Sequence, residues 1–495
     1  MTRAGKEYIE GLRDGRTVFI DGETVHDVTR HPAFSGMISS VASAYDYADT
    51  PENRGVMTFP SPLTGRPCNM SFLVPRTEDD LRRRRTALQR TAEQSYGLIG
   101  RGPEHVAGLL AGWAGRSDIF GRSDQRYGEN ITRFYEHVRD EDLYCTYAIV
   151  PPQIDRSRPA HQQEEPHLYA SVAGERDDGI IVRGAQMLAT ATTVADYVIM
   201  TSILPLVPGD EDYAISVAVP VGAPGVRVHS RRGYAESVTS RYDYPLTSRF
   251  DETDALVVFD DVFVPWEHVF VYRDREALSA QWNLTPAHLL GNNQAQVRLA
   301  TKLDLLAGVS QRVAEMNGSA KFPPVQSALG QIAAYATTIS GLVYAQEQAC
   351  RIDERGVAWP GPAECFAAMT LQIEIVPKLL DLVRDLCGGG LIQLPSSARD
   401  FANPQAAADL ERYVHSPGYP SQERVKLMKF AWDLIGSEFA GRHHQYEMFY
   451  AGAPHLVRSR MARVYDFEAA TGLLDRALDE YTLEESLSGS HTPTT

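Results

Sequence analysis

The sequence predicts an α+β protein in which a mainly helical N-terminal part, a central β part and a C-terminal helical bundle follow one another. Three observations predict this order. Periodic apolar residues indicate amphipathic helices in residues 1–140, and short β-branched segments separated by turn residues dominate residues 141–272. Long periodic runs rich in Ala, Leu and Val then fill residues 273–495. We therefore predict three domains with these boundaries, the central one a sandwich or barrel.

The N-terminal part contains three clear helix signals. Residues 6–15 form a short amphipathic start, and residues 77–97 and 103–113 are longer periodic runs. Thr77 suits the N-cap because three acidic residues follow it, and Pro103 suits the first helical position.

The central part begins with a buried strand at residues 143–150, which Pro151 and Pro152 must end because proline cannot donate to a sheet ladder. A turn at residues 177–179 separates two further strands. The predicted strands after the first are residues 167–172, 180–183, 197–201, 213–220, 226–230 and 255–264.

A polar loop follows the first of these strands. Gln153, Ile154, Asp155 and Arg156 place an amide, a carboxylate and a guanidinium beyond a strand end, where they can hydrogen-bond a planar polar ligand. The alternative is a turn in which Asp155 and Arg156 satisfy one another. Residues 184–193 are small and rich in hydroxyls, so a flat ligand could approach their backbone closely.

The C-terminal part is helical. Its predicted helices are residues 297–316, 325–353, 363–386 and 424–440. Gly388 to Gly390 follow the third helix, where the simplest interpretation is a helix C-cap. The polar, Thr/Ser-rich tail from Glu484 is expected to fray.

Composition excludes several classes of function. A formal net charge of −16 argues against nucleic acid or an anionic membrane as a partner. The five cysteines include no CxxC pair, which indicates neither a disulfide framework nor a metal site and favours a cytoplasmic location. No apolar run is long enough to span a membrane, and no P-loop or GxGxxG motif follows a strand.

Several ordered segments resemble the HpaB-type flavin-dependent monooxygenases, the oxygenase components typified by 4-hydroxyphenylacetate 3-monooxygenase. The segments are PPQIDRSRP, DGIIVRGAQMLAT, ADYVIM and residues 96–105, 250–270, 387–401 and 436–452. The resemblance extends over nearly the whole chain and implies an acyl-CoA dehydrogenase-like fold. It also implies a homotetramer in which C-terminal helical segments complete the flavin sites of neighbouring subunits.

The resemblance implies a two-component reaction. A separate NAD(P)H:flavin reductase would supply reduced FAD, which would react with O2 to a flavin C4a-hydroperoxide and hydroxylate an aromatic substrate ortho to a phenol hydroxyl. The substrate would be a phenolic compound or a tyrosine derivative, either free or tethered to a carrier protein.

Arg101, His105 and Tyr147 match the family's catalytic and substrate positions. Arg101 would supply a cation beside the phenol oxygen, and His105, in the first turn of a helix, would be neutral and able to accept a proton. Phenol hydroxylases of the family carry Tyr where this chain has His105, and His where it has Tyr147. This exchange either moves the proton acceptor to the other side of a phenol or indicates another ring, such as an indole or a pyrrole. Without the resemblance, a surface His and a loop Arg would be the simpler interpretation.

The resemblance also assigns ligand contacts. Thr201 and Ser202 match positions near the substrate, in addition to the three residues above. The positions that match the family's FAD contacts are Tyr147, Gln153, Ile154, Asp155, Arg156, Thr190, Gly389, Gly390, Gly441, Arg442 and His443. The alternative for Arg442 and His443 is a solvated helix end.

Two other functions stay open from the sequence. A dehydrogenase or dehydratase acting on a CoA thioester shares the fold, and Glu438 or Glu447 could be its carboxylate. A flavin-binding protein without catalysis is the second. The basic run at residues 82–85 could dock an acidic carrier protein, although a solvated helix face is the simpler interpretation.

Overall fold

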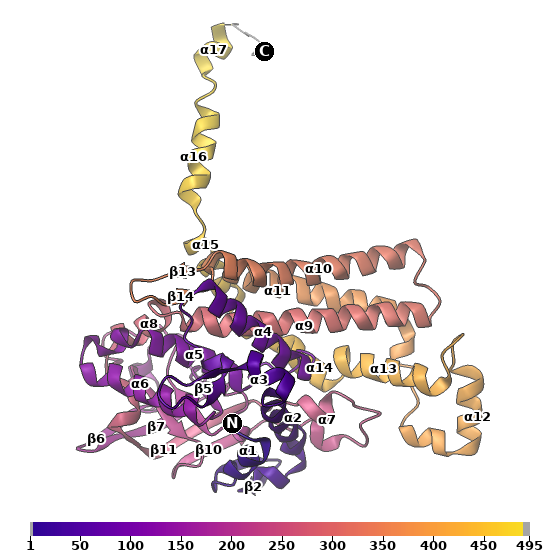
Figure 1. The fold of residues 1–495 in the computed structure, drawn as a ribbon, viewed down its shortest axis with the longest axis horizontal. Coiled ribbons are helices and arrows are strands. Elements are labelled where there is room, and N and C mark those ends of the chain that lie inside the picture. Colours follow the sequence, from indigo (N-terminus) through magenta and orange to yellow (C-terminus); the bar gives the residue numbers. More distant parts are fainter. Residues whose placement is uncertain (1–2, 489–495) are drawn as a thin grey trace.

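The computed structural model describes residues 3–488. Figure 1 shows the long helices α9, α10 and α11 side by side across one side of the molecule, with the N-terminal helices and the sheets packed beneath them. An arm of two short helices leaves the body at the C-terminal end.

The N-terminal helices have the predicted start signals. The Thr77 side chain accepts a hydrogen bond from the backbone N–H of Asp80 (3.1 Å), and the Asp80 carboxylate accepts one from the N–H of Thr77 (3.2 Å). The helices predicted at residues 77–97 and 103–113 are therefore confirmed as α4 and α5. The helices are α1 (Gly5–Gly11), α2 (Pro32–Ala48), α3 (Pro51–Met57), α4 (Glu78–Gln94), α5 (Pro103–Gly115) and α6 (Gln125–Asp140).

Two sheets form the β part. The larger has the order β2-β1-β10-β11-β7-β6, and the smaller has the order β12-β9-β8-β5. Their strands are β1 (Thr17–Ile20), β2 (Glu23–Val25), β5 (Cys145–Ala148), β6 (Ser171–Arg176), β7 (Gly179–Gln186), β8 (Tyr197–Met200), β9 (Ser216–Pro220), β10 (Val226–Ser230), β11 (Ala255–Pro265) and β12 (Val269–Val271). Two short hairpins, β3 (Thr58–Pro60) with β4 (Pro67–Asn69) and β13 (Arg351–Ile352) with β14 (Ala358–Trp359), lie outside these sheets.

Each predicted strand is present, although the one predicted at residues 213–220 begins only at Ser216, and the short strands β1 to β4 and β12 to β14 were not predicted. The strand expected at residues 167–172 begins only at Ser171, because His167 has a positive φ of 59° that interrupts extended backbone. No strand was predicted at β1, although its β-branched and aromatic residues favour one, and it pairs in parallel with β10. The N-terminal part thus contributes to the sheet of the central part.

The pairing of β5 with β8 sets the position of the site. These strands are parallel, with Tyr147 opposite Ile199. Because parallel strands end at the same sheet edge, the loop after β5 and the residues after β8 lie together. The backbone N–H of Met187 donates to the Val150 carbonyl (2.7 Å), which brings the end of β7 to the same edge.

The C-terminal helices are α8 (Arg275–Asn283), α9 (Ala287–Met316), α10 (Pro323–Gln348), α11 (Pro362–Cys387), α12 (Pro404–Tyr413), α13 (Ser421–Ile435), α14 (Glu438–Phe449) and α15 (Pro454–Val464). The single helix predicted at residues 424–440 is wrong. It is interrupted at Gly436, and the Ser437 hydroxyl caps α14 by accepting from the N–H of Ala440 (3.1 Å).

The start of α9 also differs from the prediction, because the helix begins at Ala287 rather than at residue 297. Its first turns carry amides that are buried and hydrogen-bonded rather than apolar. Asn293 donates to Gln346 (3.0 Å), and Gln296 accepts from Gln346 (2.5 Å). Hydrophobic periodicity cannot detect a helix end that is buried through amide pairing.

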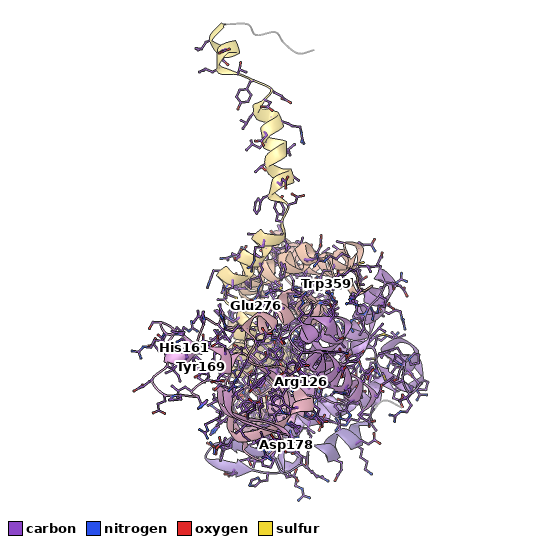
Figure 2. All side chains as sticks on the ribbon, turned by 90° about the vertical axis from the view of Figure 1, so that its left-hand side faces the viewer. Arg126, His161, Tyr169, Asp178, Glu276 and Trp359 are labelled. Carbon is purple, nitrogen blue, oxygen red and sulfur yellow. The ribbon has the colours of Figure 1, made fainter. Side chains whose placement is uncertain are left out.

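The arm comprises α16 (Phe467–Leu478) and α17 (Leu483–Ser488) and projects away from the body in both views (Figures 1 and 2). The tail predicted to fray from Glu484 is helical as far as Ser488, and its remainder, residues 489–495, lies outside the described residues. Within residues 3–488, no helix combines the length and apolar character needed to cross a membrane.

Candidate active site

Arg101, His105 and Tyr147, which lie on different elements, meet at the junction of α5 and β5. The Arg101 guanidinium carbon lies 5.3 Å from the centroid of the Tyr147 ring. The rings of His105 and Tyr147 are 5.5 Å apart. Arg101 and His105 are only 7% and 4% exposed, so the alternative of a surface His and a loop Arg is wrong.

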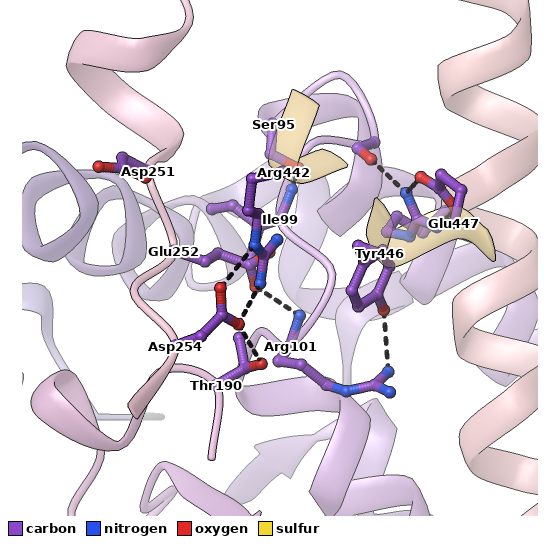
Figure 3. Close-up of polar contacts among 12 residues, drawn as sticks. Ser95, Ile99, Arg101, Thr190, Asp251, Glu252, Asp254, Arg442, Tyr446 and Glu447 are labelled. Atoms are coloured by element: carbon purple, nitrogen blue, oxygen red, sulfur yellow. Dashed lines mark hydrogen bonds and ion pairs between the residues drawn. The ribbon is translucent and has the colours of Figure 1, made fainter. Parts of the chain in front are cut away.

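The Arg101 side chain is held by aromatic residues of α14. Its guanidinium donates to the Tyr446 hydroxyl (2.9 Å) and to the Tyr450 carbonyl (3.3 Å), and both tyrosine rings lie within 6 Å of it. Figure 3 shows Arg101 reaching toward Tyr446, while its backbone N–H donates to Glu252 (2.6 Å). Within the described residues, the Arg101 guanidinium makes no ion pair with a carboxylate. Its charge is therefore oriented but not neutralised.

His105 is buried and joined to two polar side chains. Its Nδ1 lies 2.9 Å from Oε1 of Gln294, and Nε2 of Gln294 donates to Oε1 of Glu104 (2.9 Å). Burial, reinforced by the nearby Arg101 charge, holds the pKa of His105 well below its usual range. Burial also raises the pKa of Glu104 to about 7. His105 is neutral as predicted, although the main cause is burial rather than the helix end.

Thr201 and Ser202 lie at the end of β8, and both are buried. The Thr201 hydroxyl accepts from Nε2 of Gln281 (2.9 Å), and its carbonyl accepts from Nε2 of Gln186 (3.2 Å). The Ser202 hydroxyl accepts from a backbone N–H within its own turn. The amide oxygens of Gln186 and Gln281 are buried and have no partner in the described part of the chain. Two hydrogen-bond acceptors are therefore free beside Thr201.

Some of the polar side chains in the loop after β5 find their partners within the loop itself. Asp155 accepts from the N–H and the hydroxyl of Ser157 (2.9 and 2.6 Å) and pairs with Arg158 (3.3 Å), not with Arg156. Gln153 and Arg156 have no side-chain partner among residues 3–488, and the Ile154 side chain is exposed. An amide, a guanidinium and an apolar side chain are thus available to a ligand.

The wall opposite this loop is residues 187–191. Leu188 and Ala191 both have positive φ (56° and 64°), and Leu188 is exposed. A leucine held in this region is strained and occurs most often at functional sites. The Thr190 hydroxyl donates to Asp254 (2.7 Å). Ile154 and Leu188 offer exposed apolar side chains, and Gln153 and Arg156 offer polar groups without a partner among the described residues, which suits a flat heterocycle with carbonyls and a phosphate. The residues present therefore fit FAD.

Arg442 connects this wall to the catalytic loop. Its guanidinium is buried and pairs with Glu252 (3.0 Å) and Asp254 (2.7 Å) (Figure 3). Because Glu252 also binds the backbone of Arg101 and Asp254 binds Thr190, one arginine positions both segments. The alternative of a solvated helix end is wrong for Arg442.

The remaining cofactor predictions have three outcomes. His443 is buried, and neither ring nitrogen has a partner among the described residues. Gly441 lies on the same helix with open space beside it. Gly389 and Gly390 follow the C-terminal end of α11. Gln372, which lies earlier on α11, donates to Glu447 of α14, and about 25 Å of helix separate Gln372 from the two glycines. Within one chain they do not meet the Arg101 cluster.

The carboxylates considered for CoA-thioester chemistry are both occupied. Glu447 accepts from Arg298 (2.7 Å), Lys302 (2.9 Å) and Gln372 (2.7 Å). The pKa of Glu447 falls to about 2, since these cations outweigh burial. Glu438 is an exposed partner of Arg232. Neither is a free base facing the Arg101 cluster.

The basic run at residues 82–85 is not a free basic face. Arg82 and Arg83 pair with acidic residues of their own helix, and Arg85 pairs with Glu347. Arg84 is buried and donates to the carbonyls of Ser71 and Leu73 (both 2.6 Å). The solvated-face interpretation is therefore wrong for Arg84, and the run carries little free charge.

The sequence analysis missed the residues that orient this cluster. They are Glu104, Gln186, Glu252, Gln281, Gln294, Tyr446 and Tyr450. One signal could have revealed Gln294, because the run NNQAQ at residues 292–296 puts four amides at the start of a long helix. Buried amides require partners, so such a run indicates a polar network.

Comparisons with known proteins show the family to which the chain belongs. Residues 4–271 match the family model described as 4-hydroxyphenylacetate 3-hydroxylase N terminal, and residues 278–479 match its C-terminal counterpart. The chain is 36% identical to the oxygenase component of 4-nitrophenol 2-monooxygenase from Rhodococcus sp, covering 97% of this chain and 92% of the relative. It is 33% identical to a Streptomyces globisporus monooxygenase named for a (3S)-3-amino-3-(3-chloro-4-hydroxyphenyl)propanoyl group on a peptidyl-carrier protein, covering 97% and 91%.

Solved structures establish the fold. The oxygenase component of 4-hydroxyphenylacetate 3-monooxygenase in complex with FAD and 4-hydroxyphenylacetate superposes with a TM-score of 0.92 at 32% identity, covering 97% of this chain and 99% of the other. An archaeal 4-hydroxybutyryl-CoA dehydratase shares the fold with a TM-score of 0.87 at 22% identity. The predicted acyl-CoA dehydrogenase-like fold is thus confirmed, and the chain belongs to the 4-hydroxyphenylacetate 3-hydroxylase family.

Proposed function

We propose that this protein is the oxygenase component of a two-component, FADH2-dependent monooxygenase that hydroxylates a phenolic substrate ortho to its hydroxyl. The observation that carries the proposal is the pairing of a fixed, unneutralised cation at Arg101 with a neutral imidazole at His105 around Tyr147. A cation and a proton acceptor beside one oxygen favour the phenolate, whose ring is the better nucleophile. Relatives named as oxygenase components of phenol monooxygenases support the reaction class.

Each residue of the site has a role in this proposal. Arg101 stabilises the phenolate oxygen, His105 accepts its proton, and the Tyr147 ring packs against the substrate. Thr201 and Ser202, with the free amide oxygens beside them, orient its ring. Closure of the site by buried aromatic side chains excludes water.

Reduced FAD, when bound, supplies with O2 the electrophilic oxygen that enters the ring. Arg156 is suited to a phosphate because its guanidinium lacks an internal partner. Arg442 acts by holding Asp254 and Glu252 in place. The glycines after α11 would serve the site of a neighbouring subunit. The proposed flavin contacts are Tyr147, Gln153, Ile154, Asp155, Arg156, Thr190, Gly389, Gly390, Gly441, Arg442 and His443.

The substrate is either a free phenol or a tyrosine derivative on a carrier protein, as the name of the Streptomyces relative illustrates. The alternative substrate is an indole or a pyrrole, because the Tyr and His of the family's phenol hydroxylases are exchanged at His105 and Tyr147. A CoA-thioester function is not favoured because Glu447 is held by two cations.

The protein is proposed to act as a cytoplasmic homotetramer that receives flavin from a separate reductase. Support for self-association comes from the arm, whose apolar side chains are 55–77% exposed and contact nothing in the body: Phe467, Leu473, Leu474, Tyr481, Leu483 and Leu487. A helix of this length is marginal alone in water, so it requires a partner surface. We also propose domain boundaries near residues 140 and 272.

The test is anaerobic binding of reduced FAD followed by mixing with ¹⁸O2 and a panel of phenols. Mass spectrometry of the products should find one catechol carrying a single ¹⁸O atom. Reoxidation of FAD at the rate of free flavin, without labelled product from any phenol, would contradict the proposal.

A further inference from the structure

We propose that Gln294, oriented by Glu104, is a positioning residue that fixes the neutral tautomer of His105 with the proton on Nδ1 and leaves Nε2 as the acceptor of the substrate's phenolic proton. This inference rests on the proposed function and deepens it. It assigns a role to an amide of α9 that lies outside the loop and wall described above.

The order of donors along the chain of contacts determines the tautomer. Above about pH 7, where the Glu104 carboxylate is mostly ionised, it has only acceptor oxygens, so the NH2 group of Gln294 must face it (2.9 Å). Oε1 of Gln294 therefore faces His105, and Nδ1 at 2.9 Å must be the donor. In a neutral imidazole the other nitrogen is then a bare acceptor.

Two glycines make room for this arrangement. The Glu104 carboxylate folds back over the backbone at Gly102, where an added Cβ would force the carboxylate to shift. An added Cβ on Gly291 would lie 3.5 Å from Cε1 and 3.9 Å from Nε2 of His105. Any larger side chain at residue 291 would therefore cover the proposed acceptor.

Neighbouring amides of α9 contrast with Gln294. Asn293 and Gln296 both hydrogen-bond the side chain of Gln346, and Gln296 also donates to the carbonyl of Cys365 (2.9 Å). These contacts lie away from the Arg101 cluster. Gln294 alone among these amides turns toward α5. Nε2 of His105 has no hydrogen-bond partner among the described residues, although the ring lies against Tyr147.

The proton transfer follows from this geometry. The O–H bond of the phenol breaks, its electron pair stays on the phenol oxygen, and the proton passes to Nε2. The imidazolium that forms lies near the Arg101 and Arg298 charges and the His288 ring, which oppose it. The Glu104 carboxylate offsets this repulsion, because its negative charge polarises Gln294, which accepts from His105. Glu252 lies near Glu104.

The experiment measures the ionisation of a bound phenol rather than turnover. 4-Nitrophenol, whose neutral and ionised forms absorb at different wavelengths, is titrated with pH on the full-length protein with reduced FAD and no oxygen. We expect the wild type to lower the apparent pKa of the bound probe relative to the free probe. Gln294→Met keeps the side-chain length but cannot hydrogen-bond, and should raise this pKa by about one unit or more.

Two further variants separate positioning from packing. Gln294→Glu preserves an acceptor for Nδ1–H and should retain the lowered pKa. Gln296→Met removes an equally buried amide of the same helix and should leave the probe's pKa unchanged. If Gln294→Met fails to fold, Glu104→Gln tests the same relay, because an amide at residue 104 no longer dictates the orientation of Gln294; the probe's pKa should then rise.

A wild-type pKa for the probe bound to Gln294→Met or to Glu104→Gln would overturn the inference while leaving the proposed function intact. Failure of the wild type to bind 4-nitrophenol or to lower its pKa, together with no labelled catechol in the ¹⁸O2 test, would overturn both.

Discussion

At the scale of single residues, the site depends on charges that are buried but not cancelled. Arg101 is oriented by Tyr446 of α14 and by Tyr450, which caps that helix, rather than by a carboxylate. Its neighbour His105 is kept neutral by burial and by the Arg101 charge. In the proposed function, a cation stabilises the substrate oxygen while an uncharged base takes its proton.

Arg101→Met should abolish this stabilisation. We expect kcat to fall by about 10² to 10³, the usual cost of losing one oriented charge or donor at a developing anion. Product formation in single-turnover reactions measures the effect. Arg126→Met is the control, since that guanidinium stacks on Trp266 (4.6 Å) on the surface (Figure 2). Equal loss in both variants would contradict the assigned role.

His443 gives a prediction for the pH dependence of stability. Burial lowers its pKa well below the ordinary value of 6.5, and neighbouring cations lower it further. Below pH 6.5 the unfolded chain binds a proton that the folded chain does not, so stability decreases as pH falls, by up to about 1.4 kcal/mol per pH unit.

His443→Gln removes this titration. The free energies of unfolding of wild type and variant should differ little in their pH dependence above pH 7. Below pH 6.5 the wild type should lose stability faster, as urea titrations at several pH values can measure. Parallel curves between pH 5 and 6.5 would contradict the burial of a neutral His443.

At the scale of elements, α14 is the part on which the site depends most. It provides Arg442 to the wall, Tyr446 to Arg101 and Glu447 to a buried pair of cations on α9. The sequence predicted residues 436–452 as a family segment. It did not predict which side chain of this segment contacts which partner, because ion pairs between distant segments have no local signal. The first third of α9, residues 287–296, was missed for another reason, since its run of amides resembles a loop.

Glu447→Gln should destabilise the fold. It leaves Arg298 and Lys302, which are 1% and 5% exposed, without their counter-ion. We expect the free energy of unfolding to fall by about 3 to 5 kcal/mol, measured by urea denaturation. Glu438→Gln, an exposed partner of Arg232, should change it by less than about 0.5 kcal/mol. A loss below about 1 kcal/mol for Glu447→Gln would refute the buried network.

At the scale of the whole molecule, the proposed assembly rests on the arm, whose apolar side chains are exposed. The sequence predicted the order of helices, strands and bundle correctly, because amphipathic periods and proline signals are local. It also identified Arg101, His105 and Tyr147 through the family resemblance. It could not predict the parallel pairing of β1 with β10 or the projection of α16, since both depend on contacts between remote parts of the chain.

Removal of the arm should alter the assembly. In size-exclusion chromatography with light scattering, a chain that ends at residue 464 should form an assembly with fewer subunits than the full chain. Leu473→Glu with Leu474→Glu should have the same effect, because charges replace the apolar stripe of α16. Glu468→Gln is the control on the same helix. An unchanged number of subunits for the truncated chain would contradict a role of the arm in self-association.

The most direct test of the account is the ¹⁸O2 reaction of the reduced FAD complex with phenols, run for wild type and Arg101→Met. We predict one labelled catechol from the wild type and at least tenfold less from the variant, with unchanged binding of reduced FAD. Labelled product at the wild-type level from Arg101→Met, or no labelled product from the wild type with any phenol, would contradict the central claim that the Arg101, His105 and Tyr147 cluster hydroxylates a phenol.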